Sequence, residues 1–312
     1  KTTKFSTSSP AAPVAPSAAA PTRNEFAERL LKGSVKKSYA PIVDIDWDTP
    51  LDPDKFYLPP KTVSLYGTAL WDSMSREEQI ELSRQELVNT LSAGIWFENI
   101  LNQALLRKMM HQDPTARATH YELTELGDET RHMVMFGKAI ERVGAKPVRP
   151  RLYQRIVINA LRFAFRGSLL WVAALIGEEI FDSLQRQMMD DPELQPIIQR
   201  LMRIHVTEEA RHIQFARDGL RKRAPHMRRV NRMFVANING LGGVFFRFLP
   251  AVSASDYHSY FHTDWETPEM VPWTGLEAAT RAFAKIIDEV NKLPLSTFQR
   301  PEEPAPQRAA AD

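Results

Sequence analysis

Two five-residue stretches of this sequence are nearly identical, and both combine acidic residues with a terminal histidine. They are DETRH at 128–132 and EEARH at 208–212. In each stretch a glutamate and a histidine three residues apart would share one face of a helix. A further glutamate lies 31 residues before each motif glutamate: Glu98 before Glu129, and Glu178 before Glu209. One glutamate and one Glu-x-x-His, given twice, form the ligand set of a dinuclear metal centre in a four-helix bundle.

The upstream glutamates are embedded in apolar sequence. Glu98 shares its helical face with Leu91 and Ile95, and Glu178 shares its face with Trp171 and Leu175. A buried carboxylate needs a cation or a strong donor, and a bound metal is such a cation. One Glu-x-x-His alone is common on solvated helix surfaces, so the prediction rests on two matched copies.

The chemistry of the donors indicates which metals to expect. The chain has no cysteine, so imidazole and carboxylate must be the ligands, and this set favours iron or manganese over softer metals. Two iron ions cycling between Fe²⁺ and Fe³⁺, or a manganese–iron pair, would suit this ligand set, and open coordination positions would bind O₂ as co-substrate.

The two halves differ at one position. His205 lies four residues before Glu209 on the same helical face, and its counterpart before Glu129 is Glu125. From spacing alone, His205 is either a seventh metal ligand or a histidine that is hydrogen-bonded within the core.

Residues beside the motif glutamates could orient the histidines. Metal-bound histidines usually donate their second N–H to a carboxylate, and we expect Asp128 to orient His212 and Glu208 to orient His132 across the bundle. The alternative is exposed salt bridges, which contribute little. Four further polar residues are expected around the ligands: Arg131, Arg211, Asn102 and Asp182. The two arginines would neutralise the charges of Asp128 and Glu208.

Composition limits the classes of function. The 312 residues carry a net charge of only +2, which does not favour nucleic acid as a partner. No predominantly apolar stretch of 18 residues is free of charge, so no membrane span is expected. The N-terminus lacks a signal-peptide layout, and we expect a cytoplasmic protein.

The pattern predicts an all-α chain, because no segment alternates with period two. We expect a ferritin-like four-helix bundle with additional C-terminal helices and an extended N-terminal arm. The predicted divisions are a disordered tail at 1–22, the arm at 23–74, the diiron domain with C-terminal helices at 75–299, and a disordered tail at 300–312.

Capping signals give the expected helix boundaries. Ser75 and Glu78 form a capping-box pattern that opens the first long helix, which should end near Met110. Asp113-Pro114 and Asp191-Pro192 should open the second and fourth helices, with a break near 194–196 as an alternative for the fourth. The remaining expected helices are the third over 152–189 and later ones over 227–248, 253–261 and 276–293.

With His205 included, the chain resembles the AurF family of ferritin-like diiron N-oxygenases over residues 80–220. The matching residues are FEN at 97–99, Asp128-Glu129-x-x-His132, Glu178 and His205-x-x-x-Glu209-x-x-His212. The resemblance implies seven metal ligands: Glu98, Glu129, His132, Glu178, His205, Glu209 and His212. Glu179 competes for the third helix, but Glu178 keeps the 31-residue spacing.

The resemblance also implies a function. It is O₂-dependent monooxygenation of an amine nitrogen, with an aryl amine converted to hydroxylamine, nitroso and nitro products, in a homodimer. The apolar residues expected to line the substrate pocket, or simply the bundle core, are Trp96, Phe97, Leu101, Met133, Phe136, Phe181 and Ile213. The sequence shows no nucleotide-binding glycine motif, so an external reductase or ferredoxin should supply electrons.

Alternatives remain within the same fold class. A diiron acyl desaturase or hydroxylase shares the Glu-x-Arg-His form, and basic residues between Arg221 and Arg232 could dock an acyl carrier protein or a reductase. Their simpler interpretation is a solvated surface. A ferritin-like storage protein is disfavoured by the length of the chain and would be supported by a large assembly.

Overall fold

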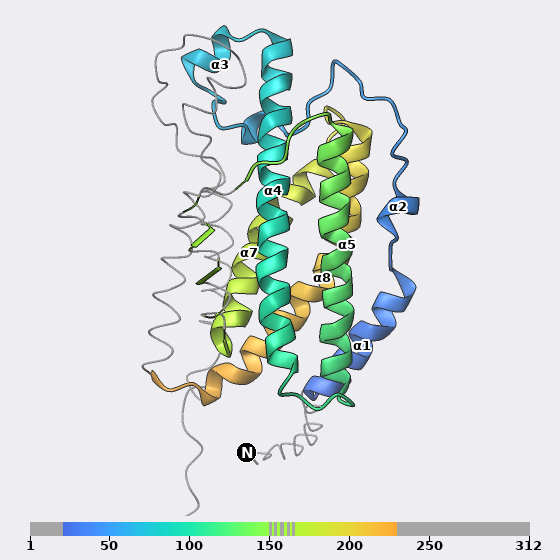
Figure 1. Cartoon of the computed structure of the whole chain (residues 1–312), viewed down its shortest axis with the longest axis vertical. Helices are drawn as coiled ribbons and strands as arrows, with labels where there is room; N and C mark the ends of the chain where they lie inside the picture. Colours follow the sequence, from blue (N-terminus) through green and yellow to red (C-terminus); the bar gives the residue numbers. More distant parts are fainter. Residues whose placement is uncertain are drawn as a thin grey trace, which may run out of the picture.

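In the computed structural model, the described residues are 21–149, 152, 155–156, 159–160, 163 and 166–229. Within the described residues, the bundle in Figure 1 is built from the long helices α4 (Arg76–Met109), α5 (Arg117–Arg142), α7 (Ser168–Met188) and α8 (Pro196–Arg223). Apart from one bridge between Phe56 and Leu194, this part of the chain has no β-structure. The predicted all-α, ferritin-like architecture is confirmed.

Helix α4 begins where its capping signal predicts. Ser75 Oγ accepts the Glu78 N–H at 3.2 Å, and Glu78 Oε2 accepts the Ser75 N–H at 2.8 Å. Each side chain thus satisfies one backbone donor that the first turn leaves unpaired. The helix runs to Met109, so the predicted first helix is confirmed.

The second and fourth helices begin later than predicted. Asp113 accepts the Thr115 N–H at 2.9 Å and forms a turn before α5, which starts at Arg117. Asp191 likewise accepts the Glu193 N–H at 3.0 Å. The fourth helix starts only at Pro196, because the backbone of Phe56 pairs with that of Glu193 and Gln195 at 2.9 and 3.0 Å. This pairing with a distant segment produces the alternative break near 194–196.

The third predicted helix is interrupted. Arg166 and Gly167 are not helical, and Gly167 has a positive φ of 56°. With ψ at −126°, Gly167 lies outside helical geometry, and α7 begins at the next residue, Ser168. The predicted helices after residue 229 and the C-terminal tail lie outside the described residues.

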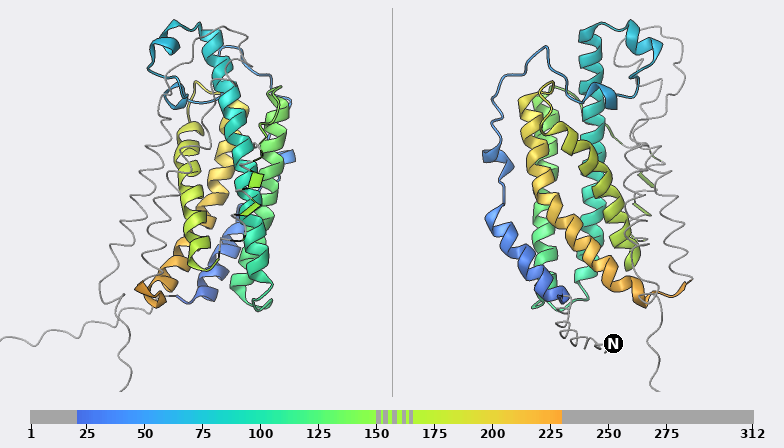
Figure 2. Two further views of the ribbon diagram at one scale, coloured as in Figure 1. Left: turned by 60° about the vertical axis from the view of Figure 1, so that its left-hand side comes forward. Right: turned by 180° about the vertical axis from the view of Figure 1, so that it is seen from behind.

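The N-terminal segment is only partly extended. It contains α1 (Arg23–Lys36), α2 (Pro41–Asp44), the short 3₁₀ helix η1 (Pro60–Thr62) and α3 (Ala69–Ser73). Helix α1 packs along α5 and α8, as Figure 2 shows. The sequence did carry a signal for α1, since Thr22 and Glu25 form a capping box. The expectation of an extended arm over residues 23–74 needs this correction.

Two apolar cores lie at different levels of the bundle. One joins residues 56–65 of the arm to the first half of α4, the second half of α5 and the first half of α8. The other joins α1 to the second half of α4, the first half of α7 and the second half of α8. The predicted metal ligands fall between these two sets along the helices. No described helix is both long enough and apolar enough to cross a membrane.

Candidate metal centre

A buried polar layer crosses the bundle between the two apolar cores. All four bundle helices contribute to it, and each of the seven predicted ligands is at most 2% exposed. Helix α4 supplies Glu98, α5 supplies Glu129 and His132, α7 supplies Glu178, and α8 supplies His205, Glu209 and His212. The structure therefore brings all seven side chains together.

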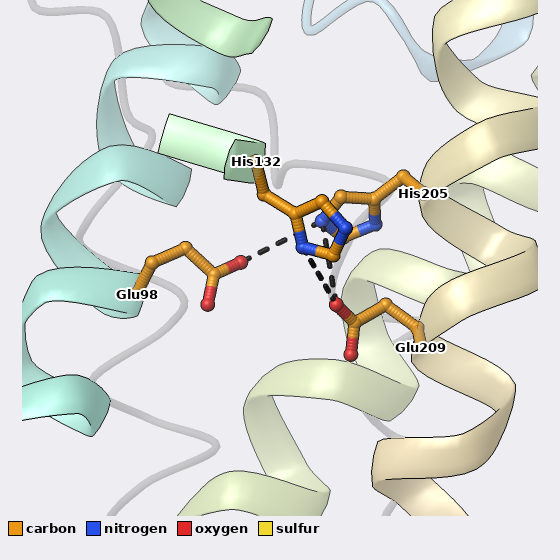
Figure 3. Close-up of side chains that lie close together, drawn as sticks. All are labelled: Glu98, His132, His205 and Glu209. Carbon is orange, nitrogen blue, oxygen red and sulfur yellow. Dashed lines mark ion pairs between the residues drawn. The ribbon is translucent and has the colours of Figure 1, made fainter. Parts of the chain in front are cut away.

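Four of these side chains converge in Figure 3: Glu98, His132, His205 and Glu209. His205 Nε2 lies 3.6 Å from Glu98 Oε1 and 3.6 Å from Glu209 Oε1. His132 Nδ1 lies 3.1 Å from the same oxygen of Glu209. The ligand atoms of this group are all within 4.8 Å of one another, which is a spacing that one metal ion could occupy.

Two further groups overlap with the first. One consists of Glu129, Glu209 and His212, and the other of Glu98, Glu129 and Glu178. His212 Nδ1 lies 2.9 Å from Glu129 Oε1 and 3.1 Å from Glu209 Oε2. Because Glu209 and Glu129 each face both His132 and His212, they occupy the middle of the layer, where a carboxylate can bridge two metals.

The outer nitrogens of two histidines face carboxylates. His132 Nε2 lies 2.9 Å from Glu208 Oε2, and His212 Nε2 lies 3.2 Å from Asp128 Oδ2. These are the cross-bundle pairs that the sequence predicts. If each Nε2 carries the proton, Nδ1 keeps its lone pair and faces the central glutamates, as a metal ligand must.

Two arginines surround these outer carboxylates. Arg131 bonds Asp128 closely, and Arg211 Nη2 lies 3.3 Å from Asp128 and 3.7 Å from Glu208. Asp128 and Glu208 are buried, at 2% and 0% exposed. The alternative of exposed salt bridges therefore does not describe them.

Burial and mutual repulsion give the ligands unusual titration in the absence of a metal. Burial raises the pKa of Glu98 and of Glu178 well above the ordinary value, and neighbouring carboxylates raise it further. Burial opposes ionisation of Glu209, yet His212 and His132 hold its pKa well below the ordinary value. Burial lowers the pKa of His205 to about 3. A divalent cation would relieve the repulsion among the carboxylates.

The donor atoms fit a metal centre. Among the described residues, no hydrogen-bond partner is found for three kinds of buried atom: Glu98 Oε2, Glu178 Oε1 and both ring nitrogens of His205. Buried polar atoms are normally paired, so such a set in one layer requires a reason. Carboxylate oxygens and imidazole nitrogens without sulfur suit two iron or manganese ions.

The adjacent glutamates of α7 have different surroundings. Glu178 groups with Glu98 and Glu129, whereas Glu179 pairs with Arg217 of α8. The side chain of Glu178 is therefore the one at the polar layer, as the 31-residue spacing predicts.

Other predicted residues lie near the layer with distinct roles. Asn102 is buried, and neither its amide oxygen nor its nitrogen has a hydrogen-bond partner in the described part of the chain. Asp182 accepts from Arg186 Nε at 2.6 Å, so its charge is paired within α7. Glu125 is buried, and burial raises its pKa to about 8.

The residues predicted to line a pocket fall into three sets. The Phe136 ring lies 5.0 Å from the ring of His205, directly beside the ligands. The ring centroids of Phe97 and Phe181 are 6.1 Å apart, and their planes are tilted by 45°. A β-carbon on Gly177 would overlap the Phe97 ring. Leu101 and Ile213 belong to the apolar core around α1, while Trp96 and Met133 are partly exposed.

The sequence did not indicate one contact of this site. The backbone N–H of Tyr39 donates to Glu208 Oε1 at 3.2 Å. No signal could have revealed it, because every residue except proline has this donor and the two positions are 169 residues apart.

Comparisons with known proteins show the family of the chain. Residues 20–272 match the family model described as p-aminobenzoate N-oxygenase AurF. Uncharacterized proteins of Mycobacterium tuberculosis and Mycobacterium bovis are 34% identical to the chain over 224 residues. The match covers 68% of this chain and 64% of each relative, so the chain spans less than two thirds of their length. The chain belongs to the p-aminobenzoate N-oxygenase AurF family.

Proposed function

We propose that this protein is a non-haem diiron oxygenase that uses O₂ to oxygenate the nitrogen of an amine, with aryl amines as the substrate class. The observation that carries the proposal is the buried layer of four glutamates and three histidines, all at most 2% exposed, in a chain of the AurF family. The final products would be hydroxylamine, nitroso or nitro compounds.

The ligand assignment follows the overlapping groups. Glu98, His132 and His205 would hold one metal, and His212 would hold the other. Glu129 and Glu209 lie between the histidines and would be shared. Bound iron would supply the redox chemistry that activates O₂.

The protein would supply position and a dry environment. Asp128 and Glu208 hold the outer nitrogens of the histidines, which fixes ring orientation and leaves Nδ1 for the metal. Phe136 packs beside His205, and Phe97 and Phe181 pack between α4 and α7. Their apolar rings would exclude water from the reacting amine. A separate reductase or ferredoxin would supply the electrons.

Metal analysis and product analysis test the proposal together. We expect two iron ions for each chain, and O₂-dependent conversion of at least one member of an arylamine panel to a hydroxylamine, nitroso or nitro product by the reduced protein. Fewer than two metals for each chain would contradict the diiron centre. Two metals with desaturated or hydroxylated acyl products instead would contradict N-oxygenation.

The paired glutamates of α7 offer a matched control for the site. Glu178→Gln should reduce bound iron, because it removes a charged ligand from the layer. Glu179→Gln should keep both metals, since Glu179 pairs with Arg217 outside the layer. Equal iron content in the two variants, measured after the same reconstitution, would refute the assignment of Glu178.

A further inference from the structure

The segment between α1 and α2 makes one contact with the buried site. Tyr39 is only half-buried, yet its N–H donates to Oε1 of Glu208, which is fully buried. The other oxygen of this carboxylate, Oε2, lies 2.9 Å from His132 Nε2. One carboxylate thus connects the backbone of the N-terminal segment to a predicted metal ligand.

The two outer carboxylates are held differently. Asp128 has a charged partner for each oxygen, with Arg131 on Oδ1 and Arg211 Nη2 at 3.3 Å from Oδ2. The same arginines lie farther from Oε1 of Glu208, at 3.9 and 3.7 Å. At 3.2 Å the N–H of Tyr39 is therefore closer to that oxygen than either guanidinium. The nearest of these partners of Glu208 Oε1 is therefore the backbone N–H of Tyr39, whereas the oxygens of Asp128 are paired with arginines.

Anchors on both sides hold Tyr39 in place. Before it, Arg23 of α1 donates to the Phe215 carbonyl at 2.6 Å and to Asp218 at 2.9 Å. After it, Arg200 Nε donates to the Asp44 carbonyl at 3.0 Å. All these partners of the segment lie on α8, the helix that also carries Glu208.

We propose that the backbone N–H of Tyr39 positions Glu208, and through Glu208 the imidazole of His132, so that one half of the metal centre depends on a segment outside the four-helix bundle. The inference rests on the proposed metal centre. Tyr39 is a positioning residue, and its side chain is not required for this role. The His212 half is instead held by Asp128, whose two oxygens are paired by Arg131 and Arg211.

A pair of variants at one position tests this. Tyr39→Pro removes the N–H, whereas Tyr39→Ala keeps it and removes only the ring. Each protein is loaded with Fe²⁺ without oxygen and titrated with a ferrous chelator. We expect Tyr39→Pro to bind one of its two metals about 10-fold more weakly, the lower end of the range for partners that orient a ligand. Tyr39→Ala and the unaltered protein should match at both metals.

A second chemical change covers the case in which the proline variant does not fold, as judged by circular dichroism. Replacing the amide of Tyr39 with an ester removes the N–H and keeps every side chain, and the same ester at Ala40, whose N–H bonds the exposed Asp44, is the control. The inference is supported if the ester at position 39 weakens the binding of one metal and the ester at position 40 does not. Unchanged binding with that ester, or equal weakening with both esters, overturns it. If the unaltered protein binds no pair of metals, the proposed function fails instead.

Discussion

The two helix pairs of the bundle carry the same motif but surround it differently. The α4–α5 pair supplies Glu98, Glu129 and His132, and the α7–α8 pair supplies the equivalent Glu178, Glu209 and His212 at the same spacing. One position breaks the equivalence, because Glu125 on α5 corresponds to His205 on α8. Both are buried, but only His205 belongs to a group of candidate ligands. Equal spacing along the sequence therefore does not produce equal metal sites.

The difference extends to charge. Burial raises the pKa of Glu125 to about 8 and lowers the pKa of His205 to about 3. Without metal both side chains are largely neutral at pH 7. The α7–α8 pair can thus offer the neutral nitrogen lone pair of His205. The α4–α5 pair holds the protonated carboxyl of Glu125 at the matching position. We infer that the metal bound by His205 is the richer in nitrogen ligands.

The largest expected effect removes what the two halves share. Glu209 faces both His132 and His212 at 3.1 Å, so Glu209→Ala should prevent stable binding of both metals. Removing a metal ligand should weaken binding by more than the roughly 10- to 100-fold typical of residues that only orient a ligand. Iron content after reconstitution is the measurement, with the exposed Glu77→Ala on α4 as control. Retention of both metals would show that Glu209 is not shared.

The next effect tests the position at which the halves differ. His205→Ala should weaken one metal, because His205 Nε2 lies among the ligand atoms of Glu98, His132 and Glu209. Glu125→Gln should leave iron content unchanged, because it replaces a neutral carboxyl with a neutral amide of similar shape. Titration with a ferrous chelator separates the two outcomes. Equal losses in both variants would mean that the halves are alike.

A smaller effect should distinguish the outer carboxylates. Asp128→Asn and Glu208→Gln should each weaken metal binding by about 10- to 100-fold, at the His212 and His132 sites respectively. Asp128→Asn should be the more harmful to stability, since it leaves the 7% exposed Arg211 without its closest carboxylate. Thermal unfolding of the metal-free variants measures this. A greater loss of stability in Glu208→Gln would reverse the comparison.

The smallest effect is the pH dependence of the metal-free protein. The folded-state pKa values of Glu98, Glu178, His132 and His212 are well above their ordinary values, and that of Glu125 is about 8. A raised pKa contributes stability at low pH that is lost as pH rises through it. The thermal unfolding midpoint, Tm, should therefore decrease as the pH is raised from 6.5 to 8. The decrease is about 2–4 °C for each kcal/mol of stability lost.

Bound metal should remove this fall, because ligands bind metals in their deprotonated forms and higher pH favours that binding. The lowered pKa values of Glu129 and Glu209 act below pH 6.5, and the lowered pKa of His205 opposes the trend only in the lowest part of this window. Differential scanning calorimetry at both pH values, with and without iron, makes the comparison. A metal-free protein that becomes more stable toward pH 8 would contradict this account.

The sequence by itself determined the features that depend on local spacing. A capping box between Ser75 and Glu78 fixes the start of α4, because its hydrogen bonds join residues three apart. Helical periodicity places Glu129 with His132, and Glu209 with His212, on inward faces. The apolar stripe and the 31-residue interval similarly predict Glu178 as the ligand on α7, whereas Glu179 forms an ion pair with Arg217.

Only the tertiary structure decided the features that depend on partners distant in the sequence. Helix α8 starts at Pro196 because the Phe56 carbonyl accepts a hydrogen bond from the Gln195 N–H. Tyr39 reaches Glu208 because hydrogen bonds of Arg23 to Phe215 and of Arg200 to Asp44 hold the N-terminal segment against α8. The motifs could therefore predict a dinuclear centre, but not that its two halves are supported differently. That difference comes from backbone and arginine contacts that leave no periodic pattern in the sequence.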